Sequence, residues 1–185
     1  KLLMEALQQS AFKDGLTGLY NRKFLEEHTK KLIPQALRDK FNIGVLLLDM
    51  DHFKAVNDEY GHDIGDKVLK ELARILNETI RESDIIIRYG GEEFIVLLVN
   101  IKTEEQAISV ANKIRIKVSE NEIDVYAGSK LRKTVSIGLS MFPEDSSSLE
   151  SVIKNADIAL YEAKSKGRNQ VVRFQSEHTS SIDLF

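Results

Sequence analysis

One short apolar run constrains the fold of this chain more than any other feature of its sequence. The segment from Ile43 to Leu48 is apolar throughout and ends at Asp49. Such a run is typical of a strand that is buried on both faces, in the middle of a sheet covered by helices. The C-terminal end of such a strand opens toward a site, so Asp49 is placed to take part in chemistry.

The remaining pattern predicts helices and strands in turn along the chain. Helices are expected at 1–13, from Asn21 to an interruption at Pro34, and at 51–60, 63–79, 103–120 and 149–165. Further strands are expected at 85–88, 94–99, 123–126, 133–141 and 170–174. We therefore predict an α/β fold of the α+β kind, with a mixed central β-sheet flanked by helices.

Composition limits the classes of function. With 185 residues, 42% of them apolar, the chain suits one ordinary domain with a short extension at either end. It has no cysteine, so any bound metal has oxygen or imidazole ligands, and its formal charge of −3 argues against a nucleic-acid polymer as partner. No apolar run approaches the roughly 20 residues of a membrane helix. Because the first residue is Lys1, we expect a piece of a longer protein.

Three carboxylates are candidates for a metal site. Asp49 ends the central strand, and Glu92 and Glu93 follow Gly90-Gly91 between two predicted strands, a good signal for a hairpin turn. Neighbouring strands would bring these acids together, where like charges share a proton or bind a hard cation such as Mg²⁺. Any one of them alone is more often a solvated loop residue. Their combination favours a metal.

Four motifs occur in a fixed order. Residues 14–22 read DGLTGLYNR, residues 48–58 read LDMDHFKAVND, residues 90–94 read GGEEF and residues 161–169 read YEAKSKGRN. Each resembles a motif of the GGDEF family, and the third resembles the signature that names the family, in its GGEEF form. The resemblance extends from about residue 14 to residue 174.

This resemblance implies a fold similar to the palm domain of nucleotide polymerases and to class III nucleotidyl cyclases. It implies a diguanylate cyclase, a nucleotidyltransferase in which the 3′-hydroxyl of one GTP attacks the α-phosphorus of another, twice, to yield cyclic di-GMP and two pyrophosphates. Each domain would hold one GTP, so two copies must face each other as a homodimer. The helix at 1–13 would transmit the signal of an upstream sensor or receiver domain.

The resemblance also implies the metal ligands. Asp49 and Glu92 would hold Mg²⁺ or Mn²⁺, two ions per active site, with the carbonyl of Met50 and the carboxylate of Glu93 as further ligands. Such ions lower the pKa of the attacking hydroxyl and stabilise charge on the phosphates. Glu92 is a candidate for assisting deprotonation of the 3′-hydroxyl, and the sequence leaves open which carboxylate takes the proton.

Six further residues match family positions that bind the substrate. Asn57 and Asp66 would read the guanine edge, since an acceptor left unpaired by adenine costs about 1–3 kcal/mol. Contacts to the triphosphate or its surroundings are implied for Lys54, Phe53, Lys164 and Arg168, the last two expected on one face of a helix end. Without the motifs, helix capping, dipole partnership or core packing would explain these residue types equally well.

Arg81 and Asp84 imply a second site, for the product. They match the inhibitory R-x-x-D motif of the family at its usual distance before the glycine pair. The arginine can address a guanine edge or a phosphate and the aspartate can accept from guanine N–H groups, so we expect cyclic di-GMP to bind here and inhibit. Arg115 is available as a second arginine. An exposed Arg–Asp pair is otherwise usually a weak surface ion pair.

These assignments divide the chain into a signalling helix at 1–13, a catalytic domain at 14–175 and a polar, frayed tail at 176–185. We expect a cytoplasmic domain, which a missing N-terminal region of the full-length protein could anchor to a membrane. Two rival interpretations stay open. One is an inactive receptor that only binds GTP or cyclic di-GMP. The other is a cyclase or polymerase-like enzyme that uses another nucleotide, such as one that makes a mixed cyclic dinucleotide.

Overall fold

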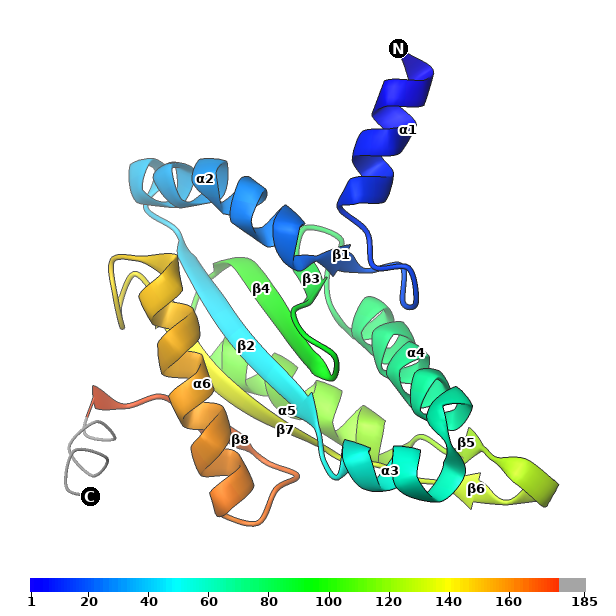
Figure 1. The fold of residues 1–185 in the computed structure, drawn as a ribbon. Coiled ribbons are helices and arrows are strands. Elements are labelled where there is room, and N and C mark those ends of the chain that lie inside the picture. Colours follow the sequence, from blue (N-terminus) through cyan, green and yellow to red (C-terminus); the bar gives the residue numbers. More distant parts are fainter. Residues whose placement is uncertain (177–185) are drawn as a thin grey trace, which may run out of the picture.

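The middle of the molecule is a mixed sheet of six strands (Figure 1). The computed structural model describes residues 1–176. The strands are β1 (Tyr20–Asn21), β2 (Asn42–Met50), β3 (Ile85–Arg88), β4 (Glu93–Ile101), β7 (Val135–Phe142) and β8 (Val171–Arg173), in the order β1-β3-β4-β2-β7-β8. β2 pairs antiparallel with both neighbours, whereas β1 and β8 pair parallel with theirs. The predicted fold class is confirmed, and the apolar run forms the buried centre of β2.

Helices cover both faces of this sheet (Figure 1). They are α2 (Arg22–Asp39), α3 (Phe53–Tyr60), α4 (His62–Thr79), α5 (Glu104–Glu120) and α6 (Leu149–Ser165), whereas a further helix, α1 (Leu2–Ala11), projects away from the sheet (Figure 1). α3, α4 and α5 form one apolar core with Leu46 and Leu48, and α2 and α6 form another with Val45 and Leu47. Because side chains alternate along a strand, Asp49 lies on the face of α2 and α6.

The close approach of α6 to the sheet brings its last turn to the end of β2. Small residues, Ser136, Gly138 and Ser140, occupy three of the four positions of β7 on this face, and Phe142 occupies the fourth. A side chain at Gly138 would come within 2.0 Å of the carbonyl oxygen of Ala156. The Ser140 hydroxyl donates to the carbonyl of Val152, one turn earlier on the helix. The helix therefore packs directly on the backbone of β7.

The expected interruption at Pro34 is wrong, because α2 continues past it to Asp39. Leu25, Leu32 and Ala36, on either side of the proline, are buried. Their packing outweighs the one backbone hydrogen bond that a proline removes.

The region between α5 and β7 also differs from the prediction. A two-stranded hairpin of β5 (Ile123–Asp124) and β6 (Lys130–Leu131) stands there, and β7 begins two residues later than the expected strand at 133–141. All but one residue of the expected tail at 176–185 lies outside the described residues.

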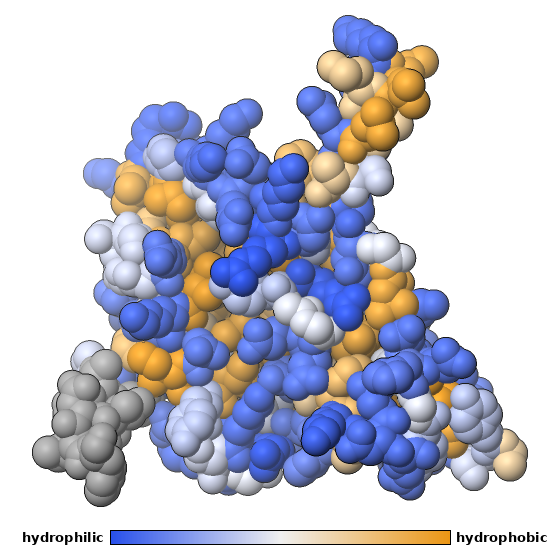
Figure 2. All heavy atoms as spheres, in the orientation of Figure 1, coloured by the Kyte–Doolittle hydropathy of each residue, from blue (hydrophilic) through white to orange (hydrophobic). Residues whose placement is uncertain are grey.

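The first helix projects from the body of the molecule, with the N-terminus at its far tip (Figure 1). None of its residues is buried, and Leu2, Leu3, Met4 and Leu7 are largely exposed. Figure 2 shows these apolar side chains gathered on the projecting helix. Among the described residues, no helix is both long enough and apolar enough to cross a membrane.

Candidate active site

Asp49 lies at the end of β2, opposite Glu93 of β4 in the antiparallel register. Directly opposed residues share a face of a sheet, so both carboxylates lie on the side of α2 and α6. Asp49 is only 4% exposed, and its Oδ2 forms an ion pair with the ammonium of Lys164 at the end of α6. Its Oδ1 is buried and has no hydrogen-bond partner among the described residues. A buried acceptor without a partner indicates a place for a ligand.

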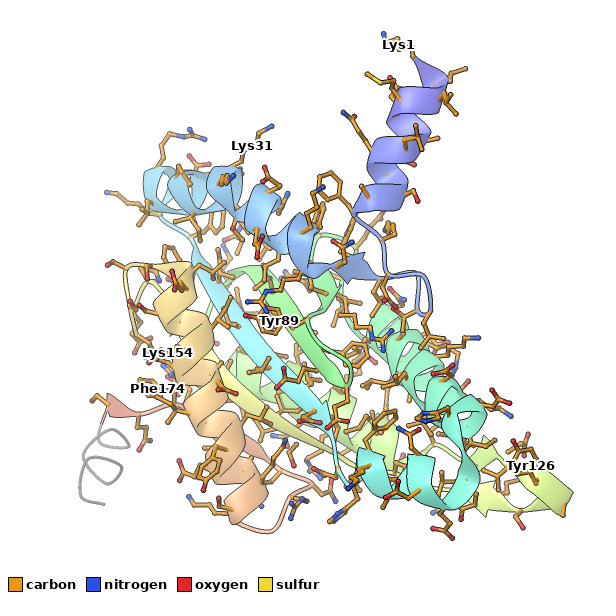
Figure 3. All side chains as sticks on the ribbon, in the orientation of Figure 1. Lys1, Lys31, Tyr89, Tyr126, Lys154 and Phe174 are labelled. Atoms are coloured by element: carbon orange, nitrogen blue, oxygen red, sulfur yellow. The ribbon has the colours of Figure 1, made fainter. Side chains whose placement is uncertain are left out.

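The turn between β3 and β4 carries Glu92, as the glycine pair predicts. The backbone amides of Tyr89 and Gly90 both donate to the carbonyl of Glu93, which closes the hairpin. Figure 3 shows Tyr89 on this turn, close to the start of α2, where the Arg22 guanidinium lies 4.4 Å from the centre of the tyrosine ring. The hairpin and α2 together hold Glu92 beside the end of β2.

Burial and neighbouring negative charges raise the pKa values of the three acids. Burial is the largest cause for Asp49, Glu92 and Glu93, and the charge of Asp49 raises the pKa of both glutamates further. The Lys164 ammonium acts in the opposite direction on all three. Additional positive charge would therefore be favourable at this cluster.

The cluster is a suitable donor set for a divalent cation, although it is not preassembled as one. Within residues 1–176, no group of three or more acidic, histidine or cysteine side chains is arranged to hold a metal ion. Lys164 binds one oxygen of Asp49, and the other is the unpaired Oδ1. Carboxylate oxygens are the ligands that Mg²⁺ prefers, so the residues present fit such an ion.

Replacing Glu93 by glutamine is expected to stabilise the metal-free protein increasingly as the pH rises. The pKa of Glu93 is raised above its ordinary 4.5, so the folded state holds the proton more tightly than the unfolded chain. Wild type therefore loses stability as the pH rises from about 4 through the raised pKa, and the variant avoids this loss. Thermal unfolding with a chelator, from about pH 4 to 8, measures the difference in melting temperature. A difference that does not change with pH would contradict the prediction.

Asn57 of α3 lies against Gly65 of α4 where the two helices pack. The side-chain oxygen of Asn57 is buried without a partner in the described part of the chain, and a Cβ at Gly65 would stand 1.9 Å from it. Asp66 follows on the exposed surface of α4. A free amide oxygen near a carboxylate offers acceptors for the N–H groups of a base edge.

Phe53 and Lys54, at the start of α3, differ in how far their side chains are exposed to solvent. Lys54 is exposed, whereas Phe53 is 9% exposed and belongs to the core that α3 and α4 share. The Phe53 ring also lies near Gly65, since a Cβ there would be 3.3 Å from its Cζ. The Phe53 ring therefore packs in the core and supports the position of α4, whereas the charged Lys54 side chain is exposed to solvent.

The prediction that Lys164 and Arg168 share one face of a helix is wrong. α6 ends one residue after Lys164, and Gly167, with a φ of 115°, turns the chain away. Glycine permits this ending because it has no Cβ. Arg168 follows with a φ of 65°. Both positive charges still act on Asp49, where they oppose the effect of burial on its pKa.

Arg81 and Asp84 lie at the far end of β3 from the acids and bind each other. The Asp84 side chain is 2% exposed and accepts hydrogen bonds from Arg81 and from the amide of Val99. Arg81 is 55% exposed and borders a cavity of about 370 Å³, which Lys13 and Asn77 also line. Because the Asp84 carboxylate already accepts hydrogen bonds from the protein, Arg81 is the member of the pair that can bind a ligand without rearrangement.

Arg115 lies elsewhere. It donates hydrogen bonds to Asn112 of its own helix and to Asn169, next to Arg168. It therefore belongs to the end of the molecule that holds the acid cluster, away from Arg81.

Two residues outside the predicted set hold the site together. Arg88 donates to the carboxylate of Asp14 and to the carbonyl of Gly91, so it ties the glycine turn to the segment after α1. Asp51, which is 2% exposed, accepts the amide of Asn169. Their place within or beside the sequence motifs is the only signal that points to them.

The fold and the cluster define a class of protein: a mixed α/β domain that gathers carboxylates and a lysine at the end of its central strand. The chain belongs to the GGDEF family of diguanylate cyclase domains, since the family described as "Diguanylate cyclase, GGDEF domain" matches residues 11–170. The resemblance inferred from the four motifs is confirmed.

Known proteins are similar over most of the chain. YhcK of Bacillus subtilis is 43% identical over 171 residues, 92% of this chain and 47% of that protein. Diguanylate cyclase A of Treponema denticola is 46% identical over 132 residues, 71% of this chain and 35% of that protein. The solved coiled coil and GGDEF domain of DgcB from Caulobacter crescentus, in complex with c-di-GMP, has a TM-score of 0.85 at 30% identity and covers 92% of this chain and 90% of its own. The chain thus spans less than half the length of these two curated relatives.

Proposed function

We propose that this chain is a diguanylate cyclase, which condenses two GTP molecules into cyclic di-GMP and two pyrophosphates. The observation that supports this most directly is the pairing of Asp49 with Glu93, with an unpaired Asp49 oxygen and the Lys164 ammonium beside them. A cation and a phosphate can be bound side by side there. Family membership and the cyclase among the relatives support the same reaction.

The metal ligands in this proposal are Asp49, Glu92, Glu93 and the Met50 carbonyl. Two ions, Mg²⁺ or Mn²⁺, would lower the pKa of the attacking hydroxyl and stabilise charge on the phosphates. Glu92, whose pKa is raised by burial and by Asp49, is the carboxylate we assign to assist removal of the 3′-hydroxyl proton.

The remaining side chains orient GTP. Lys164, Arg168 and the exposed Lys54 would bind the triphosphate, and Asn57 with Asp66 would accept the N–H groups of guanine. The Lys164 ammonium then exchanges one Asp49 oxygen for phosphate oxygens. This keeps the positive charge at the site while the nucleotide enters.

The reaction needs two copies of the domain, because each holds one GTP. We propose a homodimer, in which α1, with its exposed apolar side chains, passes on the state of an upstream sensor or receiver domain.

The division of the chain into a signalling helix at 1–13, a catalytic domain at 14–175 and a tail at 176–185 remains a prediction. A cytoplasmic location accords with GTP as the substrate.

Chromatography of the products tests the proposed reaction. The protein is incubated at high concentration with Mg²⁺ and either GTP or ATP. Cyclic di-GMP from GTP alone is the expected result. No product, even from subunits joined covalently, would support the receptor interpretation, and a product from ATP would support an enzyme that uses another nucleotide.

Replacing Gly65 by alanine is expected to weaken GTP binding with little loss of stability. The new Cβ would stand 1.9 Å from the Asn57 amide oxygen, so that side chain must move. Alanine also favours a helix over glycine by about 1 kcal/mol, which offsets the strain. We expect the KM for GTP to rise roughly tenfold and the melting temperature to change by less than about 4 °C. An unchanged KM would show that Asn57 does not contact the nucleotide.

Replacing Arg81 by alanine is expected to relieve inhibition by the product. The arginine is the exposed partner beside the cavity, and a charged hydrogen bond of this kind contributes about 1.5–3 kcal/mol. The concentration of cyclic di-GMP that halves the initial rate should rise by roughly tenfold or more. Unaltered inhibition would place the product elsewhere.

A further inference from the structure

Asp51 lies one residue beyond β2 and is buried within a set of hydrogen bonds. Its Oδ1 accepts from the Ser136 hydroxyl at 2.6 Å, and its Oδ2 accepts from the Thr134 hydroxyl at 2.7 Å. The same Oδ2 accepts the backbone amide of Asn169 at 3.0 Å. Two of these donors are at or just before the start of β7, whereas the third belongs to the loop between α6 and β8.

That loop adopts a backbone conformation that needs support. Gly167, Arg168 and Asn169 follow one another with φ values of 115°, 65° and 47°. Left-handed backbone is unfavourable for residues with a Cβ, and it persists where surrounding contacts enforce it. The hydrogen bond from the Asn169 amide to Asp51 is such a contact.

The loop is tied to β2 at both of its ends. Lys164, just before it, pairs with Asp49, and Asn169, at its end, bonds Asp51. Arg168 stands between these two attachments. The two acids at this strand end thus help to fix the backbone of this arginine, together with the hydrogen bond from the Arg168 amide to the carbonyl of Ala163 and the one from Arg115 to the Asn169 side chain.

We propose that Asp51 is a positioning residue that holds Arg168 in the orientation required for binding the GTP phosphates. It acts through the Asn169 amide and does not contact the nucleotide. This inference rests on the proposed function, in which Arg168 binds the triphosphate.

Hydrogen exchange of the Asn169 amide, measured by NMR without nucleotide, tests the attachment itself. Asp51→Ala should speed this exchange by at least about tenfold relative to wild type, since the amide loses its acceptor. Thr134→Val is the matched control, because it removes another donor to the same oxygen and leaves the Asn169 bond in place. Asp51→Asn should also keep the amide protected, since its side-chain oxygen can still accept. Equal exchange in wild type and Asp51→Ala would overturn the proposal.

The KM for GTP tests whether the attachment acts through Arg168. Asp51→Ala should raise it roughly tenfold, and Thr134→Val by less than about twofold. In an Arg168→Ala background, Asp51→Ala should add little, because the group it positions is already gone. Additive effects would overturn the proposal.

A variant that does not fold and a wild type that makes no product can each be distinguished from failure of this proposal. If Asp51→Ala does not fold, Asp51→Ser replaces it, because its hydroxyl is too short to reach the Asn169 amide. If wild type makes no cyclic di-GMP, the proposed function fails, and the exchange experiment still decides whether Asp51 holds the loop.

Discussion

Replacing Glu92 by glutamine is expected to lower the rate of cyclic di-GMP formation by about 1000-fold or more. The amide has nearly the same shape but can neither neutralise a divalent cation nor take a proton. Because burial and the neighbouring Asp49 raise the pKa of Glu92, loss of its charge should leave the fold at least as stable as wild type. The measurement is the initial rate at saturating GTP and Mg²⁺, with the product separated by chromatography.

Glu105→Gln is the matched control for this variant. Glu105 is exposed in the first turn of α5, so its replacement by glutamine removes the same charge at a position away from the acid cluster. Its rate should stay within about twofold of wild type. A Glu92→Gln protein that unfolds at the wild-type temperature or above and retains more than about a tenth of the wild-type rate would remove Glu92 from the catalytic residues.

Replacing Gly138 by alanine is expected to lower the free energy of unfolding by about 3 kcal/mol or more. The added Cβ would stand 2.0 Å from the carbonyl oxygen of Ala156 and 2.5 Å from the amide nitrogen of Leu160. These are backbone atoms of α6, which cannot turn aside as a side chain can, so the helix itself must shift. The shift would also move Lys164 from Asp49, and activity should fall with stability. Denaturant unfolding measures the change.

Gly44→Ala separates this clash from the general effect of alanine in a buried strand. Gly44 is in the neighbouring buried strand β2, but its Cβ would meet only side-chain atoms, at 3.4 Å. Its free energy of unfolding should change by no more than about 1 kcal/mol. Similar losses for both variants would show that contact with α6 is not what makes Gly138 necessary.

The position of the acid cluster could be predicted from local patterns. An apolar run of strand length locates Asp49 at a strand end, and a glycine pair between two β-rich runs locates Glu92 and Glu93 on a hairpin. These signals reside in consecutive residues, and the pairing of β2 with β4 brings them together. The prediction that the helix breaks at Pro34 was wrong because it relied on a local preference alone. Buried side chains on both sides of the proline outweigh that preference.

The sequence by itself determined the family, the central strand and the acids at its end, because each depends on residues close together in the chain. Only the tertiary structure decided that Lys164 pairs with Asp49, that Arg168 leaves the helix and that Asp51 holds the loop through Asn169. The ion pair joins residues 115 positions apart and the loop contact joins residues 118 apart. Spacing within a motif contains no information on such contacts, since they arise only when α6 packs on β7 and brings the end of that helix to the end of β2.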